Sequence, residues 1–195
     1  MKKLVLSVIV ATAAIAATGV SHAQSATYAA DPTHTFVTFE AKHFGTSTLR
    51  GRFDKKEGSV TFDRAAKTGK AEFTLDAASV STGVPQLDSH LKGKDFFNAA
   101  EAPTAKFSGD KFSFDANNKL TSVAGTLTML GKTQPVTLTA SNFNCYESPM
   151  LKREVCGGDF ETTIARSQWG MSYGLNFGIP DNIRLLIQVE AVKQQ

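Results

Sequence analysis

The sequence is built from short runs in which apolar and polar residues alternate. In TFVTFEAKH, residues 35–43, one face carries Val37, Phe39, Ala41 and His43 while the other is mostly polar. The same alternation recurs in KAEFTLDA (70–77), SVAGTLTML (122–130), PVTLTA (135–140), FETTIAR (160–166) and IRLLIQVEA (183–191). Because successive side chains of a strand point to opposite faces, these runs predict strands with one buried and one solvated side.

Polar, turn-forming clusters separate the alternating runs. They are DKKEG (54–58), DANN (115–118) and GKTQP (131–135). Many short strands joined by such turns predict an all-β fold, an antiparallel barrel or sandwich. One segment, PQLDSHLKGKDFF (85–97), begins with proline and has helical spacing of its apolar residues, so we expect one short helix there.

The N-terminus resembles an export signal. MKK supplies a basic start, an apolar stretch follows, and Ser21-His22-Ala23 has the small-x-small pattern of a cleavage site. We therefore expect residues 1–23 to be a cleaved signal peptide and residues 24–195 to form a single domain, with a retained N-terminal anchor as the alternative.

Charge excludes several classes of partner. The full chain has 21 Lys and Arg against 18 Asp and Glu, a net charge of +3. Removal of Lys2 and Lys3 leaves 19 against 18, or +1. This balance predicts no nucleic-acid partner and gives no overall attraction to a membrane surface. No second apolar run is long enough to span a bilayer.

Cys145 and Cys156 are the only cysteines and lie within CYESPMLKREVC. In an exported protein an even cysteine count predicts a disulfide. The spacing differs from the CxxC of redox enzymes, so a structural role is favoured, and a free thiol pair is the alternative.

The histidines argue against a shared metal site. His34 and His43 are separated by nine positions, an odd number, so on one strand they point to opposite faces. They would also lie roughly 30 Å apart. We expect His34 to form hydrogen bonds where a strand begins and His43 to lie at a barrel mouth. No metal, cofactor or catalytic residue is expected. The alternative is an exported metal-dependent or hydrolytic enzyme that uses His34, His43 or His90.

Several motifs in order resemble the YceI-like family. They are DPTHTFVTFEAKHFG, LRGRFDKKEGSVTFD, LDSHLKGKDFFNAAEAPTAKF, VAGTLTMLGKTQPVTL and ARSQWGMSYG. The likeness runs from about Tyr28 to Val192. It implies an extended, lipocalin-like antiparallel barrel in the bacterial periplasm, with a long apolar cavity for polyisoprenoid or other long-chain amphiphilic lipids. It implies no catalytic residue.

On such a barrel, the alternating faces predict which side chains meet a ligand. Nine are expected against the tail: Val37, Phe39, Ala41, Phe73, Leu75, Leu127, Met129, Val136 and Leu138. The head group is expected near His43, His90 and Arg166. Each tail residue is also compatible with a solid core, in which case the protein is an interaction module. Arg166 is equally compatible with pairing to a carboxylate at a strand end. The sequence leaves open whether the protein forms a homodimer.

Overall fold

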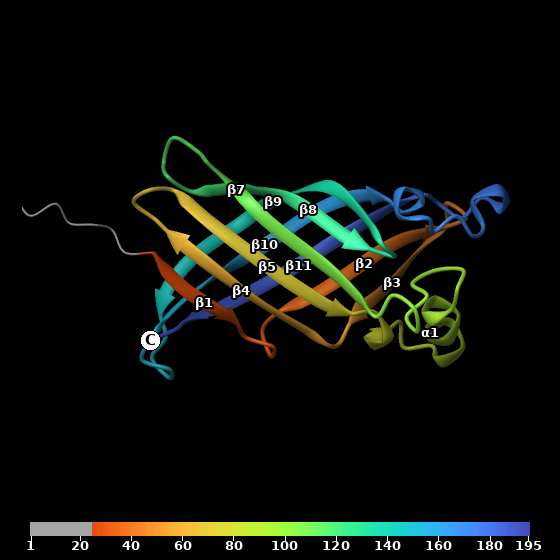
Figure 1. The fold of residues 1–195 in the computed structure, drawn as a ribbon, viewed down its shortest axis with the longest axis horizontal. Helices are drawn as coiled ribbons and strands as arrows, with labels where there is room; N and C mark the ends of the chain where they lie inside the picture. Colours follow the sequence, from red (N-terminus) through yellow and green to blue (C-terminus); the bar gives the residue numbers. More distant parts are fainter. Residues whose placement is uncertain (1–24) are drawn as a thin grey trace, which may run out of the picture.

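The computed structural model describes residues 25–195, which form an elongated barrel of antiparallel strands with one short helix at one end (Figure 1). The strands are β1 (Ala26–Ala30), β2 (Phe36–His43), β3 (Ser47–Phe53), β4 (Lys56–Asp63), β5 (Thr68–Asp76), β6 (Val80–Ser81), β7 (Thr104–Phe114), β8 (Leu120–Met129), β9 (Lys132–Glu147), β10 (Glu154–Ala165) and β11 (Asn182–Lys193). The expected signal peptide, residues 1–23, lies outside the described residues.

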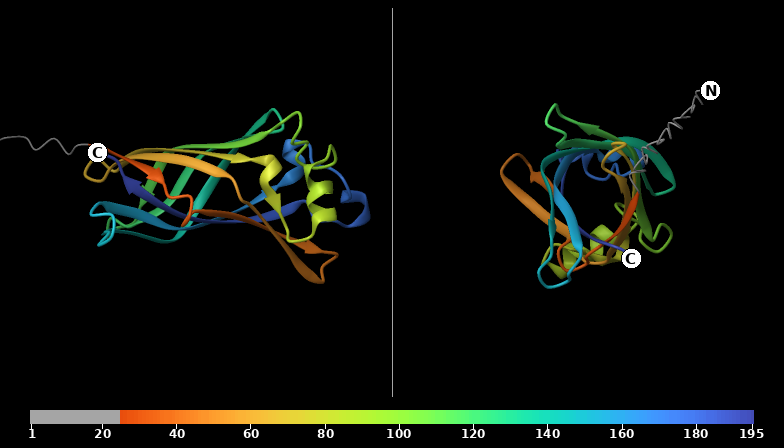
Figure 2. Two further views of the ribbon diagram at one scale, coloured as in Figure 1. Left: turned by 90° about the horizontal axis from the view of Figure 1, so that it is seen from below. Right: turned by 90° about the vertical axis from the view of Figure 1, so that its left-hand side faces the viewer.

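Eight strands close the barrel. They follow the order β1-β4-β5-β7-β8-β9-β10-β11, and β11 pairs with β1 to complete the ring. Figure 2 shows the closed ring in the end-on view. Closure removes the strand edges within this ring, while β2, β3 and β6 continue the sheet from β11 outside it. The all-β antiparallel fold expected from the alternating runs is therefore confirmed, and of the two forms left open by these runs it is the barrel implied by the family resemblance, not the sandwich.

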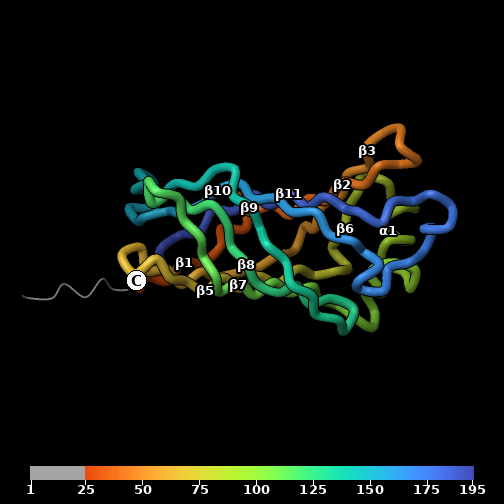
Figure 3. The backbone as a smooth tube through the Cα atoms, turned by 90° about the horizontal axis from the view of Figure 1, so that it is seen from above, coloured from red at the N-terminus to blue at the C-terminus, as the bar shows by residue number. Residues whose placement is uncertain are grey.

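The strand next to β11 changes along the barrel, because β11 has two partners on the same side. Its C-terminal part pairs with β1 (Ala30↔Ala191), and its N-terminal part pairs with β2 (Leu185↔Phe39). The strands β2 and β3 form a hairpin that extends beyond the barrel wall, and β6 pairs with β3 (Figure 3). β1 and β2 therefore occupy the same position beside β11, β1 along its C-terminal part and β2 along its N-terminal part.

Two expected turns are shorter than predicted. Only Asp54 and Lys55 separate β3 from β4, so Lys56 to Gly58 belong to a strand, and Lys132 to Pro135 belong to β9. The prediction failed because polar outward-facing residues look the same in a strand as in a turn. Pro135 is tolerated in β9 because it pairs only with β8; the register with β10 begins at Thr139.

The helix α1 spans Pro85–Lys92, shorter than the predicted 85–97. Proline has no backbone N–H, and the first residue of a helix has no partner for one, so Pro85 suits this position. Gly93 is extended and ends the helix. Residues 93–97 form turns instead, and these place Phe96 and Phe97 against the barrel interior. Three short 3-10 helices complete the described chain: η1 (Ala77–Ser79), η2 (Arg166–Trp169) and η3 (Leu175–Phe177).

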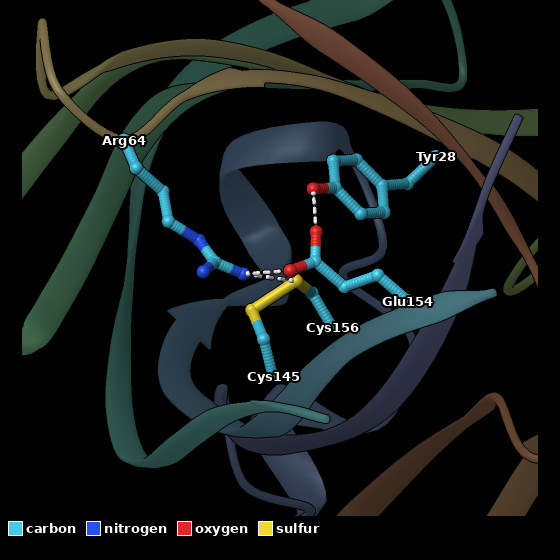
Figure 4. Close-up of a disulfide and its surroundings, with 5 residues drawn as sticks. All are labelled: Tyr28, Arg64, Cys145, Glu154 and Cys156. Carbon is cyan, nitrogen blue, oxygen red and sulfur yellow. Dashed lines mark hydrogen bonds and ion pairs between the residues drawn. A yellow bond between two sulfur atoms is a disulfide. The ribbon is translucent and has the colours of Figure 1, made fainter. Parts of the chain in front are cut away.

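The end opposite α1 carries a disulfide and a small network of hydrogen bonds. Cys145 on β9 and Cys156 on β10 occupy opposing positions and are bonded. As Figure 4 shows, Arg64 donates to Glu154 Oε2 at 2.8 Å and to Cys156 Sγ at 3.2 Å, and Tyr28 donates to Glu154 Oε1 at 2.5 Å. Burial and the neighbouring Glu154 carboxylate raise the pKa of Tyr28 to about 12. The predicted disulfide is confirmed and ties the two strands together at this end.

Candidate functional site: an apolar cavity under the helix

An apolar cavity of about 250 Å³ lies inside the α1 end of the barrel. Its walls come from β2, β3, β5, β7, β8, β10 and β11, and α1 with the residues that follow it covers one side. The loop after η2 completes the mouth through Met171, Tyr173 and Ile179. Strands buried on their inner face supply most of this surface, as their alternation predicts.

Six of the nine predicted tail-contacting residues line this cavity. They are Val37, Phe39, Ala41, Leu75, Leu127 and Met129. The other three, Phe73, Val136 and Leu138, lie outside the lining. The Phe73 ring lies over Gly58 on the neighbouring strand, where any Cβ would collide with it. Val136 is buried in the core cluster around Trp169, and Leu138 packs deeper in the barrel.

The sequence reasoning missed much of the lining. The additional apolar contacts are Leu49, Phe53, Leu87, Leu91, Phe96, Phe97, Ala105, Ile164, Met171, Ile179, Ile183 and Leu185. Some had a readable signal: Leu49 and Phe53 alternate within LRGRF, and Ile183 and Leu185 alternate within the last strand. Phe96 and Phe97 had none, because their approach depends on the turn that follows Gly93.

The charged or imidazole side chains of the lining are all basic. They are Lys42, His43, His90 and Arg166. The ring of His90 lies 3.1 Å from Asp95 through Nε2 and packs edge-on against Phe96 and Tyr173. Lys42 donates to the Thr48 hydroxyl at 2.9 Å. The mouth of the cavity therefore offers hydrogen-bond donors in an otherwise apolar surface.

Arg166 is held by backbone carbonyls. Its side chain, in a residue only 2% exposed, donates to the carbonyl oxygens of Pro180, Met171 and Tyr173 at 2.9, 2.7 and 2.7 Å. Burial lowers its pKa. The alternative of direct pairing with a strand-end carboxylate is wrong, since nearby Asp181 instead accepts from the Ser167 hydroxyl and backbone N–H. Arg166 lines the cavity, but its main role here is to fix the loop around the mouth.

His34 and His43 lie apart, but strand parity is not the reason, because His34 belongs to the turn before β2 and not to the strand. His34 precedes β2, and its Nδ1 lies 2.8 Å from Asp31 Oδ2. His34 does not line the cavity, whereas His43 and His90 do. Within residues 25–195, no group of three His, Cys, Asp or Glu side chains is arranged to hold a metal ion.

A second, smaller void of about 70 Å³ lies near the disulfide end and is lined by residues such as Phe62, Ala71 and Phe112. Phe107 and Leu138 pack against the core clusters of both halves of the barrel and so lie between the two spaces. The barrel is therefore neither a solid core nor one continuous tunnel.

Comparison with known proteins agrees with this architecture. The YceI-like domain profile matches residues 28–191. The chain belongs to the YceI-like family. It is 32% identical over 162 residues to a UPF0312 protein of Pseudomonas aeruginosa, covering 83% of each chain.

Solved structures share the fold. A Campylobacter jejuni YceI protein is 28% identical and covers 79% of this chain and 90% of its own, with a TM-score of 0.67. A polyisoprenoid-binding domain from Saccharophagus degradans covers 86% of this chain and 98% of its own, at 17% identity and a TM-score of 0.62. Among the described residues, none of the helices has the length and apolarity to cross a bilayer.

Proposed function

We propose that this protein is a non-catalytic carrier or sequestering protein of the periplasm, and that it binds the tail of an isoprenoid-type or other amphiphilic lipid inside the barrel. The observation that carries the proposal is the apolar cavity that opens beside α1. The polyisoprenoid binding ascribed to the Saccharophagus degradans domain agrees with it. The pattern of residues 1–23 supports export.

The energetics favour a hydrocarbon ligand. At about 0.8 kcal/mol per buried CH₂, ten carbons of tail contribute roughly 8 kcal/mol before ordering costs. The lining offers Val37, Phe39 and Leu127 to such a tail, with few polar atoms that would lose water on binding.

The basic lining restricts the head group. His43 and His90 offer donors at the mouth to an anionic or hydroxyl-bearing head group. The Lys42 ammonium lies beside the mouth, on the other face of the hairpin with Thr48, so a cationic head group meets like charge there. Arg166 adds positive charge nearby, although three of its donors are already used by carbonyl oxygens. We therefore expect acidic or neutral lipids to bind in preference to cationic amphiphiles.

The direct test is extraction and mass spectrometry of mature protein purified without detergent, followed by uptake of defined lipids. Co-purification or saturable uptake of a long-chain anionic or neutral lipid is expected. Protein that is lipid-free and takes up none would contradict the proposal. The enzyme alternative predicts stoichiometric metal by elemental analysis, or a hydrolytic activity, that is lost on His34→Ala, His43→Ala or His90→Ala.

A further inference from the structure

Three aromatic side chains are exposed around the mouth of the cavity. They are Phe44, Tyr173 and Phe177, with exposed fractions of 54%, 41% and 65%. We call these three residues the aromatic rim. Phe44 follows the lining residue His43, and Tyr173 and Phe177 belong to the loop that contributes Ile179 to the lining. Large exposed apolar groups that gather at one site mark an interaction surface.

Two separate loops bring the rim together. The β2–β3 hairpin and the loop of residues 170–181 both extend past the barrel at its α1 end (Figures 1 and 3). The Phe44 ring lies against Gly178: a Cβ placed there would be 3.5 Å from Phe44 Cδ1. The rim therefore lies beside the mouth of the cavity, where a lipid that enters at this end would pass.

The backbone at Phe44 is unfavourable for phenylalanine. The turn is closed by the Thr46 N–H donating to the His43 carbonyl at 2.9 Å, and its central residues Phe44 and Gly45 have φ of 48° and 72°. Positive φ is rare for bulky residues and is common for asparagine and glycine. Leu130 has a similar positive φ in the β8–β9 turn, but it packs against the core, whereas Phe44 is exposed and core packing does not account for a phenylalanine here.

Two lysines at the α1 end favour an acidic partner. Lys42 on the hairpin and Lys94 after α1 have no ion-pair partner within residues 25–195. Of the neighbouring carboxylates, Asp95 hydrogen-bonds with His90 and Asp181 accepts from Ser167, so neither is bound to a lysine, although both keep their negative charge. Although the expected net charge is close to zero, this end offers unpaired cations beside exposed aromatic rings. That combination is typical of proteins that bind an anionic bilayer surface.

We propose that the aromatic rim docks the open end of the barrel onto an anionic phospholipid bilayer. The rings of Phe44 and Phe177 enter the headgroup region, and Lys42 and Lys94 face lipid phosphates. The inference deepens the proposed carrier function, because docking in this orientation gives a lipid tail an apolar path from the bilayer into the cavity.

The test is flotation of mature protein with vesicles of phosphatidylcholine alone, or of equal parts phosphatidylcholine and phosphatidylglycerol. Wild-type protein is expected to float with the anionic vesicles and less with the neutral ones, with binding reduced at high salt. The double variant Phe44→Asn/Phe177→Ser is expected to bind about tenfold or more weakly. Its unfolding midpoint should not fall, because asparagine suits the positive φ.

Met150→Ser is the matched control, because Met150 is 90% exposed on the β9–β10 turn at the other end of the barrel. It is expected to leave flotation unchanged. Unchanged flotation of the double variant, equal loss in the control, or absence of wild-type binding to either vesicle overturns docking. Docking is also overturned if sedimentation shows that the wild-type protein is a dimer and the double variant is a monomer, because the rim then contacts a second copy of the chain.

Lipid uptake from monomeric solution separates this inference from the carrier function. If docking alone is wrong, the protein takes up lipid, but its flotation with vesicles does not depend on the aromatic rim. If the carrier function alone is wrong, it floats but yields no bound lipid on extraction after its removal from the vesicles.

Discussion

The Arg166 guanidinium donates a hydrogen bond from Nη2 to the carbonyl oxygen of Tyr173 at 2.7 Å. This bond attaches the loop of residues 170–181 to η2, directly after β10. Two further carbonyl oxygens, of Met171 and Pro180, accept from the same side chain. One buried cation thus satisfies three loop carbonyls that have no strand partner.

Arg166→Lys is expected to destabilise the protein by about 3 kcal/mol. Lysine keeps the charge but cannot reach three separated carbonyls from one planar group, and buried carbonyls left unpaired cost roughly 1–3 kcal/mol each. Urea unfolding followed by the fluorescence of Trp169 measures the loss. Arg50→Lys is the control, since Arg50 forms an exposed pair with Glu40; equal effects in both variants would contradict the role assigned to Arg166.

Ala105→Phe is expected to block lipid uptake while changing stability by only about 1 kcal/mol. Ala105 lines the cavity, so the added ring occupies space that the ligand needs instead of overpacking a filled core. Uptake of a fluorescent fatty acid and urea unfolding are measured together. Ala71→Val, beside the smaller void, is the comparison. The Ala71→Val variant should take up short-tailed fatty acids as well as wild type does. If it loses uptake of long-tailed fatty acids alone, the long tails extend past Phe107 and Leu138 into the smaller void.

The turn between β1 and β2 is expected to be most stabilising between about pH 4 and pH 6.5. Hydrogen bonds from His34 and Thr33 lower the pKa of Asp31 from 3.8 to about 2, so its contribution is lost as pH falls through that range. The Asp31 carboxylate raises the pKa of His34 above 6.5, so the contribution of His34 is complete below 6.5 and is lost as pH rises through the raised value.

Asp31→Asn should therefore remove pH dependence at both limits of this window. The measurement is the urea midpoint of wild type and variant from pH 2 to pH 8, with an NMR titration of the His34 ring. An unchanged His34 titration in the variant would contradict the pairing.

Replacement of both Cys145 and Cys156 by serine is expected to lower stability by roughly 2–3 kcal/mol, because the loop that the disulfide closes is short. Lipid uptake should be unchanged, since neither cysteine lines the large cavity. Urea unfolding and the uptake assay check the two parts. Loss of uptake in a folded variant would mean that the disulfide end shapes the ligand site.

The alternating runs were sufficient to predict much of the fold. Val37, Phe39 and Ala41 point inward as expected because side-chain alternation along a strand is local and survives any tertiary arrangement. The ends of the strands were harder to predict. Pro135 lies inside β9, and its tolerance depends on where the ladder with β10 begins, which is a long-range property.

By itself the sequence determined the all-β antiparallel fold and the inward faces of the strands, because both follow from local periodicity. The order of its motifs identified the family and so implied the barrel, and the even cysteine count predicted the disulfide. Only the tertiary structure decided which inward faces surround empty space. Phe73 and Leu75 share one face of β5, yet only Leu75 lines the cavity. The distance of a residue along the barrel axis, set by strand register and by what packs across the interior, separates a cavity wall from a filled core.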